Sequence, residues 1–261
     1  MSNLDAAQLF FVKGLVAVIT GASSGLGEVM AHALDVNGAA KVFILGRRES
    51  KLKEVASKAK NGTLIPVVCD VSSKESLQAA VSTIEKQTPF INLLIANSGY
   101  LGDVTGMVPR PAEQTLGLLG AGNTHPDSIG KSELLQSQFI STTSFSGLCR
   151  AEAPSYVYNA SKAALNHLTK TLSSEYAKHS IRANAIAPGT FVTEMTEAYT
   201  PEGGISVVGS LPWQAIPATR AGTDEDIAGA VLYLASRAGA FVNGCILLPD
   251  GGMLSVRPGS Y

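Results

Sequence analysis

Short, β-branched apolar runs alternate with longer stretches of helical periodicity along most of the chain. The runs are nearly continuous in apolar character, which is typical of strands buried on both faces of a sheet. Between them, apolar positions recur every three to four residues, as on the buried side of a helix. The pattern predicts strands at 15–20, 41–45, 64–69, 91–96, 139–144, 181–186 and 245–248, and helices at 25–36, 49–59, 73–86, 155–178 and 223–235.

Strands that alternate with helices predict an α/β fold, a doubly wound parallel sheet of the Rossmann type with about seven strands and helices on both faces. The length of 261 residues suits one large domain or two small ones. Because there is no internal repeat and no linker, we expect a single domain spanning 1–261, with ligands at the carboxyl ends of the strands.

Two segments break the alternation. Residues 101–138 hold six glycines and three prolines, so the longest helices that fit are short ones at 111–119 and 131–138. So long a loop in a compact domain is either functional or poorly ordered. Residues 191–218 are also rich in glycine, and we expect them to form a substrate loop that moves over the site.

Net charge and cysteine spacing limit the kinds of partner and ligand that we expect for this chain. A net charge of -1 gives no electrostatic reason to expect nucleic acid or an anionic membrane. Cys69, Cys149 and Cys245 are far apart and lack metal-ligand spacing, so we expect reduced core thiols in a cytoplasmic protein that holds no metal. The apolar run at 9–19 is too short to span a bilayer and lacks a basic leader, and we interpret it as a strand.

The sequence TGASSGLG joins the first predicted strand to the first helix, at residues 20–27. A strand, a glycine loop and a helix in this order turn backbone N–H groups toward a pyrophosphate, and glycine permits its close approach. A glycine loop alone is weak evidence, because a plain strand–helix turn is about as common. The candidate cofactor-binding residues in this loop are Gly21, Ser23, Ser24, Gly25, Leu26 and Gly27.

Arg47 and Arg48 follow the second predicted strand, where a dinucleotide fold meets the adenosine ribose. An acid at this place accepts from the ribose 2′-hydroxyl, whereas arginine neutralises a 2′-phosphate. The first acid, Glu49, comes only after both arginines. The pattern favours NADP(H) over NAD(H), and the alternative is that two solvated arginines begin a helix.

Tyr158 and Lys162 lie four residues apart in the longest predicted helix and therefore share one of its faces. An ammonium beside a phenol favours the phenolate and lowers a pKa that is ordinarily about 10. Such a tyrosine exchanges protons with an oxygen near neutral pH. An isolated YxxxK is usually a half-buried tyrosine with a solvated lysine, but its place downstream of a nucleotide-binding loop makes it a catalytic candidate.

Taken together, these motifs resemble those of the short-chain dehydrogenase/reductase family, in the family's order and over nearly the whole length. TGxxxGxG stands at 20–27, an NNAG-like ANSG at 96–99 and PGxxxT at 188–193. Ser144 fits the catalytic serine, with Thr143 as the second candidate. The other positions that the resemblance adds to the cofactor site are Asp70 and Val71 near the adenine, Asn97, Gly99, Pro188, Gly189 and Thr193.

The resemblance implies hydride transfer between the nicotinamide of NADP and a carbonyl or alcohol of a small molecule. Ser144 would hold the substrate oxygen and Tyr158 would protonate the developing alkoxide. Lys162 would lower the pKa of the tyrosine and bind the nicotinamide ribose. The leading interpretation is an NADPH-dependent carbonyl reductase or alcohol dehydrogenase. The alternatives are a family member repurposed for non-redox cyclisation, isomerisation or dehydration, and a non-catalytic NADP-binding protein.

The family has a long helix between the NNAG-like strand and the serine strand, and residues 101–138 do not accommodate it. We therefore expect one face of the sheet to be short of a helix. The family's helices at this place also pack across a dimer seam, so the seam is expected to be incomplete and the homo-oligomeric state is left open.

Overall fold

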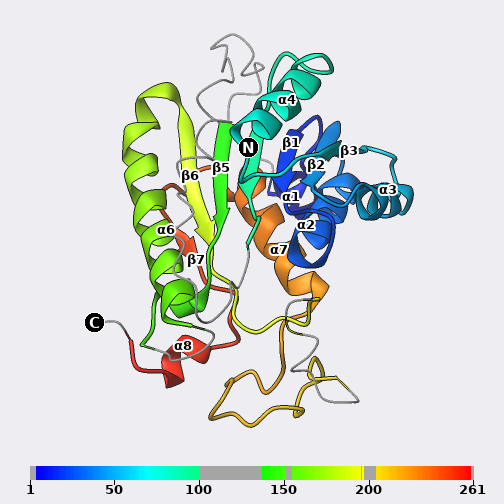
Figure 1. The fold of residues 1–261 in the computed structure, drawn as a ribbon. Coiled ribbons are helices and arrows are strands. Elements are labelled where there is room, and N and C mark those ends of the chain that lie inside the picture. Colours follow the sequence, from blue (N-terminus) through cyan, green and yellow to red (C-terminus); the bar gives the residue numbers. More distant parts are fainter. Residues whose placement is uncertain (1–3, 100–136, 151–154, 195, 197–203, 260–261) are drawn as a thin grey trace.

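The computed structural model describes residues 4–99, 137–150, 155–194, 196 and 204–259 (Figure 1). One seven-stranded sheet runs through them in the order β3-β2-β1-β4-β5-β6-β7, and every neighbouring pair is parallel. The predicted doubly wound parallel sheet is confirmed. Its strands are β1 Val16–Thr20, β2 Lys41–Gly46, β3 Leu64–Val68, β4 Leu93–Ala96, β5 Ser137–Thr142, β6 Ile181–Ile186 and β7 Ile246–Leu247.

Three of the helices, α4, α6 and α7, begin at side chains that cap their free N–H groups. Ser73 accepts from the amide of Ser76 at the start of α4, Ser155 accepts from the amide of Tyr158 at the start of α6, and Thr223 opens α7 in a capping box. The α-helices are α1 Ala6–Phe10, α2 Gly25–Val36, α3 Glu49–Ser57, α4 Lys74–Glu85, α6 Tyr156–Glu175, α7 Asp224–Ala235 and α8 Met253–Val256, and the 3-10 turns are η1 Phe145–Gly147, η2 Ala177–His179 and η4 Arg237–Gly239.

Two apolar cores lie on the two faces of the sheet, because successive strand residues point to opposite sides. Ile19 and Ile44 face the core under α2, α3 and α7. Val18 and Phe43 face the core under α4 and α6. Figure 1 shows the sheet between these two helix layers. Because helices pack on each face, the carboxyl ends of the strands are where a ligand reaches the sheet.

Two short helices, α1 and α8, were not predicted. The apolar run at 9–19 is not one strand, because α1 continues to Phe10 and β1 begins only at Val16. Asp5 starts α1 by accepting from the amide of Ala7. Ser137 also belongs to β5, so the predicted helix at 131–138 is wrong at its end. The rest of that helix, the one at 111–119 and the expected lack of a helix on one face lie outside the described residues.

The spacing of apolar residues predicts a buried side of α6 made of Ala160, Ala164, Leu165, Leu168 and Leu172, and only part of it is confirmed: Leu172 is buried and Leu168 packs against the same core. Ala160 and Ala164 are exposed, whereas Asn166 and Thr169 face the sheet. The hydroxyl of Thr169 lies 2.7 Å from that of Ser141 on β5, so a polar pair fills this contact. The helix is therefore turned so that small and polar residues, Lys162 among them, look toward the strand ends.

Candidate active site

The glycine loop after β1 and the polar segment after β4 meet where the strand order reverses. The Asn97 side-chain amide donates to the carbonyls of Thr20 at 3.1 Å and Gly21 at 3.2 Å. In return, the Thr20 hydroxyl accepts from the amides of Asn97 and Ser98, each at 3.1 Å. A crevice at this reversal is the usual ligand site of such sheets. Asn97 thus lies where predicted, and its amide holds the backbone of the loop.

The glycines of this loop leave no room for side chains. A Cβ on Gly21 would lie 2.9 Å from the Ser98 Cα, and one on Gly27 would lie 2.5 Å from the Asn97 Nδ2. Gly21 and Gly25 also have φ of +68° and +58°, in the left-handed region that favours glycine. Backbone N–H groups of the loop and of the first turn of α2 can therefore approach an anion closely.

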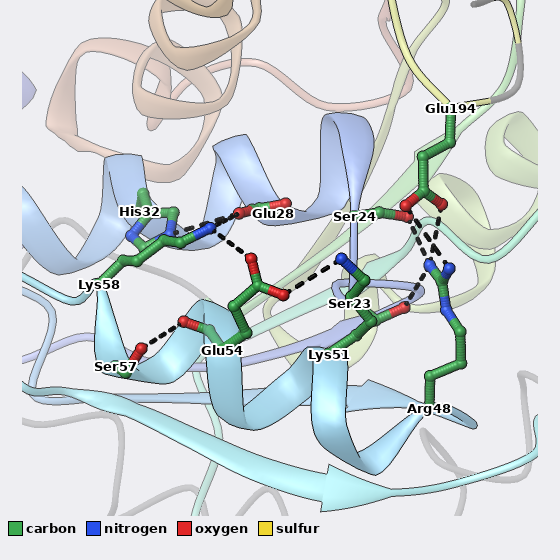
Figure 2. Close-up of polar contacts among 10 residues, drawn as sticks. All are labelled: Ser23, Ser24, Glu28, His32, Arg48, Lys51, Glu54, Ser57, Lys58 and Glu194. Carbon is green, nitrogen blue, oxygen red and sulfur yellow. Dashed lines mark hydrogen bonds and ion pairs between the residues drawn. The ribbon is translucent and has the colours of Figure 1, made fainter.

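Arg48, one of the two arginines after β2, reaches the glycine loop (Figure 2). Its guanidinium donates to the hydroxyls of Ser24 at 2.9 Å and Ser23 at 3.3 Å, and to the Glu194 carboxylate at 3.0 Å. Ser24 is the N-cap of α2, but its side chain does not bond the helix amides. Hydrogen bonds from Arg48 and Ser24 hold the pKa of the Glu194 carboxyl below its ordinary value. Arg47 is exposed.

Asp70 follows β3, the edge strand beside β2, as the predicted adenine-side residue. Its carboxylate accepts from the Ser72 amide at 2.9 Å and the Ser72 hydroxyl at 2.7 Å. Asp70 and the following Val71 are both partly buried. They lie at the same edge of the sheet as the glycine loop, and the local bonds fix the turn that leads into α4.

The PGxxxT segment after β6, residues 188–193, contacts the region of Ser144 at one end and the glycine loop at the other. The Pro188 carbonyl accepts from the Phe145 amide at 3.1 Å, next to Ser144. Gly189 packs on Asp250, since a Cβ on it would lie 2.7 Å from the Asp250 Cα. At the other end, the Thr193 Cβ lies 3.5 Å from the place that a Cβ would take on Gly25.

Ser144, directly after β5, is brought against Tyr158 near the start of α6. The Ser144 side chain interacts with the Tyr158 phenol and works to lower its pKa, and the Ser144 hydroxyl accepts from the Ser146 amide and hydroxyl at 3.2 and 3.0 Å. Thr143, the second candidate, instead donates its hydroxyl to the Ile186 carbonyl at 3.3 Å. Ser144, and not Thr143, therefore presents its hydroxyl to the tyrosine.

Lys162 lies between the ends of β4 and β5. Its ammonium donates to the Thr142 carbonyl at 2.9 Å and lies 5.4 Å from the centroid of the Tyr158 ring. It is also 3.9 Å from the place that a Cβ would take on Gly99, which puts this predicted cofactor residue at the same site. Burial lowers the pKa of Lys162 to about 8. The lysine is thus poised to carry its charge at neutral pH and to lose it in mild base.

The expected lowering of the Tyr158 pKa is wrong. Burial raises the pKa of the tyrosine, and the hydrogen bond with Ser144 offsets only part of this. The physical reason is that the ammonium lies over the ring and bonds a carbonyl, so desolvation of the phenolate dominates. The phenol is therefore neutral at pH 7, which is the form that can give a proton to an oxygen.

Two residues that shape the site were not found by sequence reasoning. Gly147 lets turn η1 rest on α6, because a Cβ on it would lie 2.7 Å from the Lys162 carbonyl carbon. Its position three residues after Ser144 is the only sequence signal. Glu194 pairs with Arg48, which is 146 residues away in the chain, and no local sequence pattern predicts a contact over that separation.

The parts of the chain that the structure describes contain no cluster of three His, Cys, Asp or Glu residues that could hold a metal. They also contain no helix long and apolar enough to cross a membrane. The three cysteines are free, with Cys69 and Cys149 buried.

Comparisons with known proteins agree with this geometry. A family model described as short chain dehydrogenase matches residues 15–116, and one described as enoyl-(acyl carrier protein) reductase matches 129–254. Short-chain dehydrogenase/reductase PhomF of Diaporthe leptostromiformis is 39% identical, over 99% of this chain and 98% of its own. The 3-oxoacyl-[acyl-carrier-protein] reductase FabG of Rickettsia prowazekii is 32% identical, over 94% of this chain and 99% of its own.

A solved structure, the Pseudomonas aeruginosa RhlG/NADP active-site complex, superposes with a TM-score of 0.82 at 25% identity, covering 95% of this chain and 99% of that one. The alignment with PhomF runs over 299 positions, more than the 261 residues of this chain, so the relative has stretches with no counterpart here. The break between the two matched ranges falls inside 101–138, the segment that departs from the strand–helix rhythm.

Proposed function

Because the chain belongs to the short-chain dehydrogenase/reductase family, we propose that it is an NADPH-dependent oxidoreductase that reduces a carbonyl of a small organic substrate, or oxidises the corresponding alcohol. The observation that carries the proposal is the Lys162 ammonium, 5.4 Å from the centroid of the Tyr158 ring, with the Ser144 side chain against the same tyrosine and a glycine loop beside them. The name of the 32% identical 3-oxoacyl reductase supports carbonyl chemistry.

The residues fit a dinucleotide phosphate. The cradle at Gly21 and Gly27 is one that a Cβ would fill, and the Ser24 side chain leaves the first amides of α2 to an anion. The Arg48 guanidinium suits the 2′-phosphate that distinguishes NADP from NAD. A structure of similar fold is an NADP complex. The proposed cofactor residues are Gly21, Ser23, Ser24, Gly25, Leu26, Gly27, Arg47, Arg48, Asp70, Val71, Asn97, Gly99, Tyr158, Lys162, Pro188, Gly189 and Thr193.

NADPH, when bound, supplies the reducing equivalent. Tyr158, neutral because burial raises its pKa, donates its proton to the substrate oxygen as negative charge develops there. The Ser144 hydroxyl, fixed by Ser146, positions that oxygen. The Lys162 ammonium, held by the Thr142 carbonyl, stabilises the phenolate that remains. In the alcohol-oxidising direction, the phenolate takes the proton back.

A binding titration with NADPH, run beside NADPH oxidation with a panel of ketones, quinones and imines, tests the proposal. We expect NADPH binding and oxidation that depends on one of these carbonyl compounds. Substrate conversion without NADPH oxidation would identify a repurposed, non-redox family member. Binding without any conversion of the panel would point to a non-catalytic NADP-binding protein.

The substrate, the cellular compartment and the oligomeric state are part of the same proposal. We propose a small-molecule substrate bound under residues 191–218, and a cytoplasmic protein whose free thiols suit a reducing compartment. We further propose that the family's dimer seam is incomplete here, which leaves the homo-oligomeric state open, since the sequence of residues 101–138 departs from the helix that normally packs at that seam. Light scattering on a size-exclusion column checks this, and a family-like tetramer would contradict it.

A further inference from the structure

The guanidinium that suits a cofactor phosphate already holds an anion. Both oxygens of the Glu194 carboxylate face Arg48, at 3.0 and 3.5 Å, and the same guanidinium spans the hydroxyls of Ser23 and Ser24 (Figure 2). Glu194 therefore occupies an anion site built from the glycine loop and from the strand end where the adenosine ribose is expected.

The carboxylate is held in this place by its own turn. The Thr193 amide donates to the Thr196 hydroxyl at 2.8 Å, and that hydroxyl donates to the Phe191 carbonyl at 2.7 Å. The turn fixes the backbone on both sides of Glu194. Thr193 in turn lies against Gly25. Because the backbone is tied down, only the rotamer entropy of the two side chains opposes the pairing of Glu194 with Arg48.

We propose that Glu194 is a specificity-determining residue for the cofactor, because its carboxylate competes with the 2′-phosphate of NADP(H) for the Arg48 guanidinium. This inference rests on the proposed function and deepens it. Two anions cannot share one guanidinium without repulsion, so a 2′-phosphate must displace the carboxylate. A cofactor without this phosphate leaves the Glu194–Arg48 pair intact.

A different role for the same acid makes the opposite prediction. The strand end lacks the acid that accepts from a ribose 2′-hydroxyl in NAD-binding folds. If Glu194 served as that acid from a distant segment, its removal would weaken NADH and would not help a 2′-phosphate. Replacing the Glu194 carboxylate by a neutral amide separates the two roles. Competition predicts tighter binding of a 2′-phosphate, whereas the ribose-binding role predicts weaker binding of a cofactor that lacks it.

The test is calorimetric titration with adenosine 2′,5′-bisphosphate and with ADP, which lacks the 2′-phosphate, on wild type and Glu194→Gln at low salt. We expect Glu194→Gln to bind the bisphosphate about two- to fivefold more tightly, the range that an exposed ion pair supports. Binding of ADP is expected to stay unchanged. Against an Arg48→Ala background, the gain from Glu194→Gln should vanish, because the two residues act through one contact.

Glu54→Gln is the matched control. Glu54 is as exposed as Glu194 and pairs with Lys51 and Lys58 on the neighbouring α3, but it does not contact Arg48 (Figure 2). An equal gain in bisphosphate affinity in Glu54→Gln, or an equal gain in ADP affinity in Glu194→Gln, would overturn the inference. Either result would show that the effect comes from the overall charge of the protein and not from the Glu194–Arg48 contact. Weaker ADP binding by Glu194→Gln would also overturn it, because ADP carries the ribose 2′-hydroxyl. A wild type that binds the bisphosphate, with no gain in the variant, contradicts the inference alone, whereas a wild type that binds neither nucleotide contradicts the proposed function as well.

Discussion

At the scale of single residues, the two arginines after β2 have different surroundings. Both are exposed, but only Arg48 hydrogen-bonds the side chains of the glycine loop. We expect Arg48→Ala to raise the Kd of NADPH about tenfold or more, because hydrogen bonds to charged groups are the strong ones, and Arg47→Ala to raise it less. Fluorescence titration with NADPH and NADH measures both. Equal losses for the two cofactors would argue against 2′-phosphate recognition.

Lys162 lowers the stability of the folded state because its ammonium, which the proposed reaction needs, is buried. Its buried ammonium has a pKa of about 8 rather than the ordinary 10.5, so the folded state disfavours the proton. We expect Lys162→Met to abolish turnover and yet to raise the free energy of unfolding at neutral pH by about 2 kcal/mol, offset in part by the unpaired Thr142 carbonyl.

The pH dependence of this gain has a definite sign. Between a folded pKa of about 8 and an unfolded pKa of 10.5, only the unfolded chain keeps the proton, so the wild type gains stability as pH rises. The advantage of Lys162→Met should therefore shrink as pH rises through this window. Urea denaturation across the range measures it, and a gap that widens with pH would refute the buried-charge explanation.

At the scale of elements, the contact between turn η1 and helix α6 holds the serine to the tyrosine. Gly147 lies so close to the backbone of Lys162 and Ala163 that no side chain fits. We expect Gly147→Ala to push η1 away, to cost about 1–3 kcal/mol of stability and to lower kcat more than NADPH affinity.

Gly229 provides the matched control for this substitution. It is an exposed glycine of α7 with nothing within 4 Å of its ideal Cβ. Gly229→Ala should leave kcat unchanged and stabilise the fold by about 0.5–1 kcal/mol through helix propensity. Thermal unfolding and steady-state kinetics on both variants check the pair, and unchanged kcat in Gly147→Ala would dissociate the η1 contact from catalysis.

Comparing the predicted and observed helices and strands shows which of them could be predicted from local sequence. Helix α2 and strand β6 have the bounds predicted for them, because their glycine loop, periodicity and β-branched runs are local signals. The short helices α1 and α8 hold too few turns to show a period. The buried side of α6 was mispredicted only in part: Leu172 is buried as expected, but Thr169 was missed because its hydroxyl pairs with that of Ser141 on β5, and the expected stripe was drawn from apolar residues alone.

At the scale of the whole molecule, alternation of strands and helices was enough to predict the parallel sheet and the edge where the motifs gather. Contacts between distant segments were not predictable in the same way. The Glu194–Arg48 pair joins residues 146 positions apart, and the burial that raises the Tyr158 pKa comes from packing of the whole fold. The missing family helix stays a prediction, and the break between the two family matches falls inside 101–138, the segment that the prediction concerns.

The central claim is that Tyr158 gives a proton to a substrate oxygen beside a bound NADPH. The most direct measurement compares wild type with Tyr158→Phe, by NADPH titration and by single-turnover NADPH oxidation with whichever carbonyl substrate the panel identifies. The claim predicts nearly equal Kd values and a rate in the variant lower by a factor of about 100 or more, the contribution of general acid catalysis. A Tyr158→Phe enzyme that oxidises NADPH at the wild-type rate would contradict it.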